Sequence, residues 1–504
     1  MKETYKAGAV KLMIAGLIVR IMGFLNRIFM SNLIGAEGMG LFQLASPVYS
    51  LIILTLTAGV SITVSGMTAQ EKARGNEANA KRIAKTGFAF LLVVGTAVGI
   101  LLIAFAKPIA VHLLHDERTY LSLIMLAPCI PIVSAASAIK GYFYGASQVT
   151  PTAVSQVVEQ IVRIGVIFIL ASHIAGENLA YACALATVSA AVGEMANLLV
   201  VGYVFFKECR KPAVKAPTIT RRSAAKTIGR FSAPISVNRF LTSIMGTVES
   251  VILPMRFLAG GLNYTASIEM LGRISGMAMP LISFPTLVTS ALATTLVPAI
   301  AESMSVKNYR LANYRISRCI KMSFVMGFFC FGVFYTFGFQ IGEFFYRGQE
   351  VGPLLVKLAS CCILMYLQQT MAGILNGLGK QGAALVSTTI GYAIRLGFIW
   401  FVVPIYGISG FIWGTVISMV VSSGMNLIFI VQKTGMAFYL REWILSRFFL
   451  ALAICVTGRF LLATELGNHT AGWIFAGGVS CLLAVLLLVM FGSVRIPRRR
   501  DLKL

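Results

Sequence analysis

GLIVRIMGFLNRIFMSNLIGAEGMG, residues 16–40, has the length and apolar composition of a membrane-spanning helix, yet it contains Arg20 and Arg27. An arginine at the centre of a bilayer costs about 2.5–3.5 kcal/mol on insertion scales. The two arginines are seven residues apart, or two helical turns, so they share one helix face with Gly23. We expect this face to line a polar cavity, with snorkelling of both arginines to the interfaces as the alternative. A cavity lined with arginine would attract an anion.

The composition of the whole chain is that of a polytopic membrane protein. Hydrophobic residues make up 57% of the 504 residues and charged residues only 12%, against about 25% in a typical soluble chain. The apolar runs have the length of helices, not the alternation of barrel strands. The net charge of +25 lies in short loops at alternate helix ends, so we expect no nucleic-acid partner. The nine cysteines show no metal-ligand spacing, and we predict neither a metal nor a cofactor.

The fold class that we predict is an all-α membrane protein with about fourteen spans. The predicted spans are 10–34, 42–68, 84–106, 119–143, 152–173, 179–206, 231–253, 272–298, 320–345, 353–376, 383–404, 408–432, 443–464 and 470–492. The connections on one side, together with the adjoining span ends, contain 29 lysines and arginines, and those on the other side contain four. This bias predicts that both termini are cytoplasmic.

An internal repeat divides the chain. Residues 126–168 lie on residues 358–400 at an offset of 232, with ten identities in 43 positions, among them Arg163 and Arg395. Both copies would contain six spans and enter from the cytoplasm, which is the parallel-repeat arrangement of some transporters. We therefore expect an N-lobe over 1–206, a basic cytoplasmic linker over 207–230, a C-lobe over 231–432, and two further spans with a basic tail over 433–504.

Few ionisable residues lie well inside the predicted spans, and most of them are basic. We expect a central cavity between the two lobes to bind the anionic headgroup of a substrate. Its candidate residues are Arg20, Asn26, Arg27, Arg239, Arg273 and Arg395.

Three glutamates accompany these cations. Glu159 and Arg163 are four residues apart on one helix face, so we expect a neutralising pair there. Glu159, Arg163, Glu194 and Glu249 are the candidates for a structural or an energy-coupling role. Arg395 has Gly391 where Arg163 has Glu159, so we expect Arg395 to be the better ligand contact.

The sequence shows no enzyme signature. The outer connections are short and contain only scattered acidic residues, and the four histidines do not form a metal set. A membrane glycosyltransferase or ligase would need a carboxylate cluster or a sizeable outer domain. We therefore predict that the protein is not an enzyme.

The arrangement of six, six and two spans around a basic central loop resembles the multidrug/oligosaccharidyl-lipid/polysaccharide exporter superfamily. The stretch GAVKLMIAGLIVRIMGFLNRIFMSNLIGAEGMGLFQLASPVYSL, residues 8–51, is similar to its polysaccharide-biosynthesis branch, and the likeness extends over essentially the whole chain. The lipid II flippases of this superfamily have an arginine-x-x-glycine-phenylalanine pattern, matched here by Arg20 and Gly23-Phe24. Their eighth span has an arginine, a phenylalanine-proline and a leucine-proline, matched by Arg273, Phe284-Pro285 and Val297-Pro298.

The resemblance implies that Arg20 and Arg273 face the cavity and contact a lipid pyrophosphate. The sequence departs from those flippases at Asn26-Arg27, where they have arginine-aspartate. The last two spans would hold the lipid tail in a groove, as the family's final helices are thought to do.

The implied function is a flippase in the cytoplasmic membrane that translocates a lipid-linked oligosaccharide, the peptidoglycan precursor lipid II, by alternating access during sporulation. Its implied partners are this substrate, membrane lipids and cell-wall synthesis enzymes. An ion gradient and the membrane potential are both open as the driving force. The alternatives are a cation-coupled multidrug exporter, a translocase of polysaccharide repeat units, and a non-transporting scaffold for cell-wall enzymes.

Overall fold

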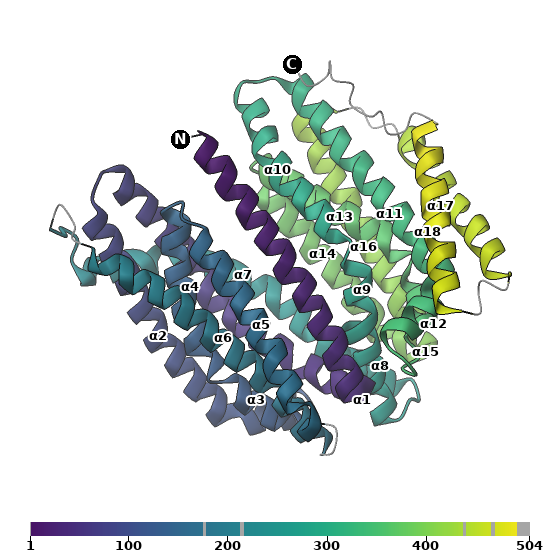
Figure 1. Cartoon of the computed structure of the whole chain (residues 1–504), viewed down its shortest axis with the longest axis horizontal. Helices are drawn as coiled ribbons and strands as arrows, with labels where there is room; N and C mark the ends of the chain where they lie inside the picture. Colours follow the sequence, from purple (N-terminus) through teal and green to yellow (C-terminus); the bar gives the residue numbers. More distant parts are fainter. Residues whose placement is uncertain (1, 175–177, 212–215, 437–439, 465–468, 491–504) are drawn as a thin grey trace. The chain divides into compact units, whose positions relative to one another are not determined.

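The computed structural model describes residues 2–174, 178–211, 216–436, 440–464 and 469–490, and these residues form helices and short turns without a strand. Figure 1 follows the helices along the chain. The chain forms two compact units, Met1–Met255 with Asn263–Gly272, and Arg256–Leu262 with Arg273–Leu504. We call them unit 1 and unit 2.

The helices of unit 1 are α1 (Lys2–Ala73), α2 (Glu77–Pro108), the π-helix η1 (Ile109–Leu113), α3 (Thr119–Leu126), α4 (Cys129–Gly145), α5 (Thr150–Ile174), α6 (Leu179–Arg210), most of α7 (Arg221–Ala259) and α8 (Tyr264–Leu271). Those of unit 2 are the π-helix η2 (Gly272–Ala278), α9 (Met279–Ser283), α10 (Thr286–Ser305), α11 (Tyr309–Phe345), α12 (Val351–Leu358), α13 (Cys361–Gly377), α14 (Gln381–Phe401), α15 (Val403–Tyr406), α16 (Ile408–Thr434), α17 (Leu440–Leu462) and α18 (Thr470–Met490).

The length and composition of these helices confirm a polytopic all-α membrane protein. Within the described residues, ten helices are long and apolar enough to cross a bilayer. An eleventh span results if α12 and α13, which meet at a bend of 58°, are counted together. The apolar part of α1 alone, Ile14–Ala73, has 60 residues and covers most of the first predicted span and all of the second. The count of fourteen and the boundaries of the lobes and the linker stay predictions.

The first two predicted spans belong to one continuous helix, α1, which is interrupted at a single residue. Residues 35–41 were expected to join two helices, but α1 continues through them and only Gly35 leaves the helical conformation, with φ 70° and ψ −174°. A residue with a Cβ adopts such a positive φ only at a cost, and glycine does not. Gly35 is therefore the point at which α1 changes direction.

The eighth predicted span, 272–298, is interrupted in the structure. Its helical stretch starts earlier, at Tyr264, and passes through η2 and α9 before α10 begins at Thr286. Pro280 and Pro285 lie at these junctions and lack the amide hydrogen that a regular helix needs. Arg273 is consequently placed on a π-helical turn.

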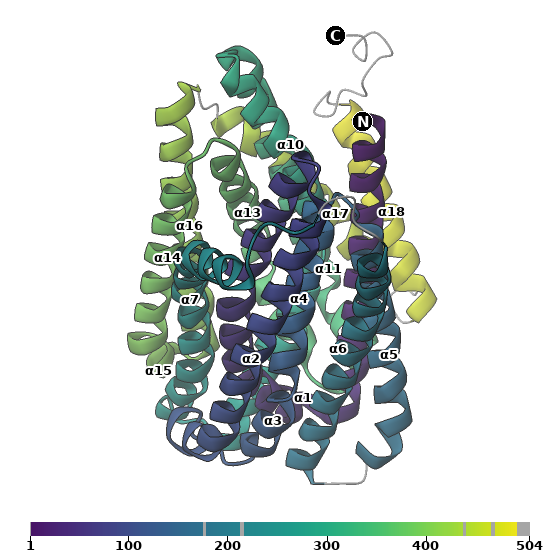
Figure 2. The ribbon, with the colours of Figure 1, turned by 90° about the vertical axis from the view of Figure 1, so that its left-hand side faces the viewer.

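Equivalent helices of the two sequence repeats pack in the same pairs. In both copies the third predicted span packs on the fourth, α2 on α4 and α11 on α13, and the fifth packs on the sixth, α5 on α6 and α14 on α16; Figure 2 shows α5 beside α6. A Cβ on Gly95 would lie 2.9 Å from the Cα of Pro131, and one on Gly327 would lie 2.7 Å from the Cα of Ile363. The two pairs differ by the repeat offset at both positions. Each copy therefore needs a glycine where these helices cross.

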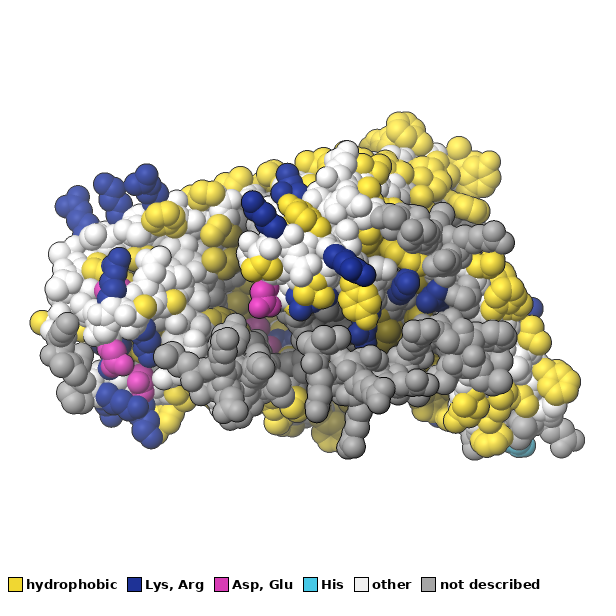
Figure 3. Space-filling model, turned by 90° about the horizontal axis from the view of Figure 1, so that it is seen from above, with side chains coloured by type: hydrophobic (Ala, Val, Ile, Leu, Met, Phe, Trp, Pro, Cys, Tyr) yellow, Lys and Arg dark blue, Asp and Glu magenta, His cyan; other side chains and the backbone are white. Residues whose placement is uncertain are grey.

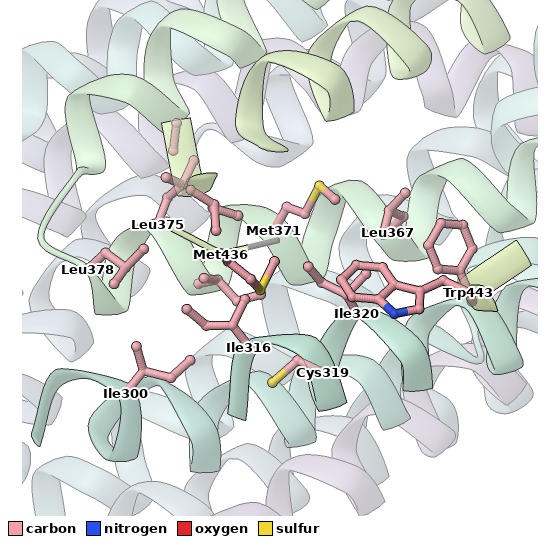
Figure 4. Close-up of a cluster of buried hydrophobic side chains, with 14 of the residues drawn as sticks. Ile300, Ile316, Cys319, Ile320, Leu367, Met371, Leu375, Leu378, Met436 and Trp443 are labelled. Carbon is pink, nitrogen blue, oxygen red and sulfur yellow. The ribbon is translucent and has the colours of Figure 1, made fainter. Parts of the chain in front are cut away.

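Apolar side chains from separate helices form the core of unit 2. Ile316 and Ile320 of α11 pack with Met371 and Leu375 of α13, and all four are 2% exposed or less. Trp443 of α17 lies in the same cluster (Figure 4). The first of the two additional spans is thus built into the core of this unit.

Part of the predicted linker is held against the turn between α1 and α2. The side-chain oxygen of Asn79 accepts hydrogen bonds from the backbone nitrogens of Thr218 and Ile219, at 2.8 and 3.1 Å. Its amide nitrogen donates to Glu71 at 2.7 Å. Because Asn79 is buried, these bonds are shielded from water, and they fix the chain just before α7.

Candidate functional site

A network of charged and amide side chains joins α5 to α6 inside unit 1. Arg163 contacts Glu159 at 2.8 Å and Glu194 at 3.6 Å through the same nitrogen, Nη2. The side chain of Asn197 donates a hydrogen bond to Glu159 at 2.6 Å. The three charged side chains are only 11–23% exposed. The predicted pair of Glu159 and Arg163 is present, and Glu194 of the next helix joins it.

Lys140 of α4 has a coulombic interaction with Glu194. Two cations, Arg163 and Lys140, therefore face two carboxylates. Sequence reasoning missed Asn197 and Lys140 as members of this network. Glu159 and Asn197 are 38 residues apart, and no local spacing links them.

The face of α1 that carries Gly23 approaches α5. A Cβ on Gly23 would lie 3.7 Å from the side-chain oxygen of Gln160. Asn26 is buried on the same helix, while Arg20 is exposed and Arg27 is half-buried. The side-chain oxygens of Asn26 and Gln160 are buried and accept no hydrogen bond from the protein. The predicted polar cavity along this face of α1 stays a prediction.

Two further predicted residues lie on α7. Arg239 is exposed, and Glu249, ten residues later on the same helix, is half-buried. Both belong to unit 1. Their assignment to the cavity or to a pairing role stays a prediction.

Arg273 forms an ion pair that the sequence did not predict. Its Nη1 lies 2.9 Å from the carboxylate of Glu350, which precedes α12. The side chain of Arg273 is 21% exposed and that of Glu350 is 74% exposed. The two residues are 77 positions apart, so only the fold brings them together. An exposed carboxylate on an arginine is readily exchanged for another anion, because water solvates it when it leaves.

Arg395 lines a pocket in unit 2 between α13, α14 and α16. The pocket is lined by Gln368, Thr388, Gly391, Tyr392, Arg395, Ser418 and Met419. The guanidinium of Arg395 lies over the ring of Tyr392, 4.6 Å from its centroid. None of the side chains that line this pocket is acidic. The pocket therefore combines one fixed cation with neutral polar groups.

The repeat offset relates this pocket to the network of unit 1. Arg163 corresponds to Arg395 and Glu159 to Gly391. On the following helix Gly193 packs against Glu159 and Ser422 packs against Gly391, which relates Glu194 to Ser423 and Asn197 to Asn426. Thus the arginine is kept in both copies, whereas both carboxylates of the first copy are neutral residues in the second. The difference at Gly391 was visible in the sequence, whereas the relation of Glu194 to Ser423 follows from the packing of the next helix.

The predicted site residues fall into both units. Arg20, Asn26, Arg27, Arg239, Glu159, Arg163, Glu194 and Glu249 are in unit 1, and Arg273 and Arg395 are in unit 2. The structure brings together Glu159, Arg163 and Glu194. The expected approach of Arg20 and Arg273 to one ligand concerns both units and stays a prediction.

The unit 1 network yields a prediction about stability. Replacing Arg163 with alanine leaves Glu159 and Glu194 close together and largely buried, so we expect a loss on the order of 3 kcal/mol. The melting temperature of the purified protein should fall clearly. Adding Glu159→Gln to Arg163→Ala should recover part of the loss, because the like charges no longer repel. An unchanged melting temperature for Arg163→Ala would show that the ion pair does not stabilise the protein.

Helices of bilayer length with ionisable side chains in their interior are typical of membrane transport proteins. The chain belongs to the polysaccharide biosynthesis protein family, whose model matches residues 6–304. It is 27% identical to stage V sporulation protein B of Bacillus subtilis (strain 168), over 98% of this chain and 96% of that protein. It is 26% identical to the lipid II flippase MurJ of the same organism, over 87% of this chain and 84% of MurJ.

The fold is shared with solved structures. A structure of lipid II flippase MurJ in the inward closed conformation matches with a TM-score of 0.72 and 14% identity, over 96% of this chain and 98% of that chain. An inward-facing multidrug resistance transporter of the MATE family matches with a TM-score of 0.63 and 15% identity, over 86% of this chain and all of that one. The family match confirms the predicted polysaccharide-biosynthesis branch, and the named relatives and structural neighbours are flippases and transporters and not enzymes.

Proposed function

We propose that the protein is a flippase that moves a lipid-linked, pyrophosphate-bearing oligosaccharide from the cytoplasmic to the outer leaflet of the cytoplasmic membrane. The substrate we favour is lipid II, used for the spore cortex. The observation that carries this proposal is the fixed cation in unit 2: Arg395 lines a pocket well inside the predicted eleventh span, with no acidic side chain in the lining. A pyrophosphate is the part of a lipid-linked sugar that such a cation binds.

The names of two relatives support the substrate class. The chain is similar over most of its length to a lipid II flippase and to a stage V sporulation protein. A cation-coupled multidrug exporter shares the fold, but it would need carboxylates available to a cationic drug. In unit 1, Glu159 and Glu194 are already paired with Arg163.

The proposal is tested by reconstituting the full-length protein in vesicles with candidate lipid-linked sugars. Exposure of the sugar in the outer leaflet is scored with a reagent that does not cross the membrane. We expect lipid II to become exposed with the protein and not with empty vesicles. Equal exposure in both preparations for every lipid-linked sugar would contradict the proposal and would favour a scaffold role.

The orientation in the membrane gives a separate prediction. On the face that Figure 3 draws, the visible Lys and Arg side chains outnumber those of Asp and Glu. Because basic residues are retained in the cytoplasm, a reporter fused after Lys215 should lie inside the cell. A reporter fused near Gly348 should lie outside. If both fusions report the same side, the assignment of spans between them is wrong.

A further inference from the structure

The first turns of α7 carry cations on one face and core residues on the opposite face. Arg222, Lys226 and Arg230 are exposed and follow one another at intervals of four residues, so they form one stripe along the helix. We call them the basic stripe. Ala224 and Ile228, which alternate with these cations, are fully buried in the core of unit 1. The start of α7 is therefore an amphipathic helix with a charged outer face.

No carboxylate of the described residues neutralises the basic stripe. Residues 209–248 contain eight lysines and arginines and no aspartate or glutamate. The ion pairs among the described residues include neither the basic stripe nor Arg221 beside it. Just before α7, by contrast, Lys211 is paired with Glu208 at 2.7 Å. The basic stripe thus keeps its positive charge at the surface of unit 1.

The position of these cations also opposes the dipole of the helix. The N-terminus of a helix is its positive end, and acidic side chains are stabilising there. The helix α2 follows this rule with Glu77 in its first turn, whereas α7 begins with Arg221 and Arg222. The charges of the side chains and of the helix end therefore repel one another. An anion that binds from outside the protein relieves this repulsion.

Hydrogen bonds fix the orientation of this segment on unit 1. The side-chain oxygen of the buried Asn79 accepts a hydrogen bond from the backbone nitrogen of Ile219 at 3.1 Å. Arg82 donates to the carbonyl of the same residue at 3.1 Å. The hydroxyl oxygen of Thr220 accepts from the backbone nitrogen of Ser223 at 3.2 Å and so caps α7. The basic stripe is consequently a preformed surface, and a ligand does not have to order it on binding.

The basic stripe ends at the depth of lipid headgroups. Arg230 directly precedes the predicted seventh span, 231–253, and Lys226 lies about 6 Å further out, at about 1.5 Å per residue. The polar layer of a bilayer is about 5–7 Å thick on each side. Phe231, which follows Arg230, is 58% exposed. A phospholipid presents a phosphate and then an apolar chain in this order, and a nucleic acid or an acidic protein does not.

We propose that the basic stripe is a binding surface for anionic phospholipids, which on the predicted orientation belong to the cytoplasmic leaflet. Their phosphates contact the cations, and their acyl chains lie beside Phe231. A headgroup with a net negative charge, such as phosphatidylglycerol, fits this surface. Phosphatidylcholine fits it less well, because the cations repel its ammonium group. The proposal does not rest on the proposed function.

The test is photochemical crosslinking of lipids to the full-length protein in vesicles. The vesicles contain equimolar phosphatidylglycerol and phosphatidylcholine, with a photoactivatable trace of one or the other. Crosslinked peptides from residues 221–231 are recovered after digestion with pepsin, which does not cut at lysine or arginine. We expect the wild type to prefer phosphatidylglycerol at this segment about fivefold or more, because each cation near a membrane surface contributes about that factor.

Two triple variants separate the basic stripe from net charge. The α7 variant, Arg222→Gln/Lys226→Gln/Arg230→Gln, should lose most of the preference. The matched control removes three exposed cations near the start of α11 and should keep it; it is Lys307→Gln/Arg310→Gln/Arg318→Gln. All six side chains are exposed, so both proteins should keep the melting transition of the wild type. An unchanged preference in the α7 variant would overturn the proposal, as would equal losses in the two variants.

Salt and a competing polyanion complete the test. Raising the salt from about 0.1 to about 1 M shortens the Debye length from about 10 to about 3 Å, so the wild-type preference should fall toward that of the α7 variant. A preference that persists at high salt would contradict a binding surface based on charge. Binding of a labelled DNA duplex is measured in phosphatidylcholine vesicles. If the α7 variant loses DNA binding and keeps the lipid preference, the surface takes a nucleic acid and the proposal is wrong.

The crosslinking experiment contains no transport step, so the two proposals fail separately. A protein that shows the lipid preference but flips no lipid-linked sugar would refute the proposed function alone. A protein that flips the sugar without the preference would refute the lipid surface alone.

Discussion

Arg20→Gln and Arg273→Gln are each expected to leave little translocation of lipid-linked sugar. Both arginines match positions that serve the pyrophosphate in related flippases, as the sequence resemblance implies. A guanidinium binds phosphate through two parallel hydrogen bonds, and glutamine provides neither this geometry nor the charge. Lysine keeps the charge without the bidentate geometry, so Arg20→Lys and Arg273→Lys should retain part of the activity.

The ion pair of Arg273 with Glu350 sharpens this expectation. The side chain of Glu350 is 74% exposed, so water solvates its carboxylate when Arg273 is replaced, and the loss of this ion pair costs little stability. A Glu350→Gln variant is the matched control: it removes the same contact but keeps the cation, and it should remain active. If Arg273→Gln and Glu350→Gln lose activity equally, the ion pair and not ligand binding is what matters at this position.

The deciding measurement is lipid-precursor flipping or sporulation in cells that carry each variant, with membrane abundance determined alongside. Removing an intramembrane charge should ease insertion by a few kcal/mol on the scales that apply to arginine. Lower abundance would therefore indicate a lost internal partner. Wild-type activity at normal abundance in both glutamine variants would remove the hypothesis of an anion-binding cavity.

Arg395→Ala is expected to impair activity per inserted molecule more than Arg163→Ala. The two arginines occupy equivalent positions of the repeat, but Arg163 lies between Glu159 and Glu194 and Arg395 lines a pocket. Arg163→Ala should mainly reduce stability and hence abundance. Arg395→Ala should mainly reduce transport by the protein that is present.

This comparison is made by dividing the flipping rate by the amount of protein in the membrane. Arg395→Lys serves as the conservative control and should recover part of the rate. If both alanine variants lose activity only in proportion to their abundance, both arginines are structural, and the asymmetry between the copies has no role in transport.

The sequence predicted the class of fold because bilayer length, apolar composition and loop charge are properties of the linear chain. It also predicted the pair of Glu159 and Arg163, since a spacing of four residues is local. It did not predict the partner of Arg273, because Glu350 is brought near by tertiary structure. The interrupted helix around Arg273 was missed for a related reason: hydropathy does not register where prolines break a span.

The same limit applies to the first two spans. The predicted spans leave residues 35–41 as a connection, but α1 needs only Gly35 to change direction, and the residues that follow are helical. Their helical conformation is stabilised by close packing, as where a Cβ on Gly40 would collide with the backbone of Ile268 on α8. Such approaches are set by the fold and not by local propensity.

The difference between Glu159 in the first copy and Gly391 in the second requires little genetic change. Every glutamate codon differs from a glycine codon by one base. A duplicated gene can therefore lose or regain the carboxylate of this ion pair in a single mutational step. Homologues that have glycine at the position of Glu159 and glutamate at the position of Gly391 would show which copy needs the carboxylate.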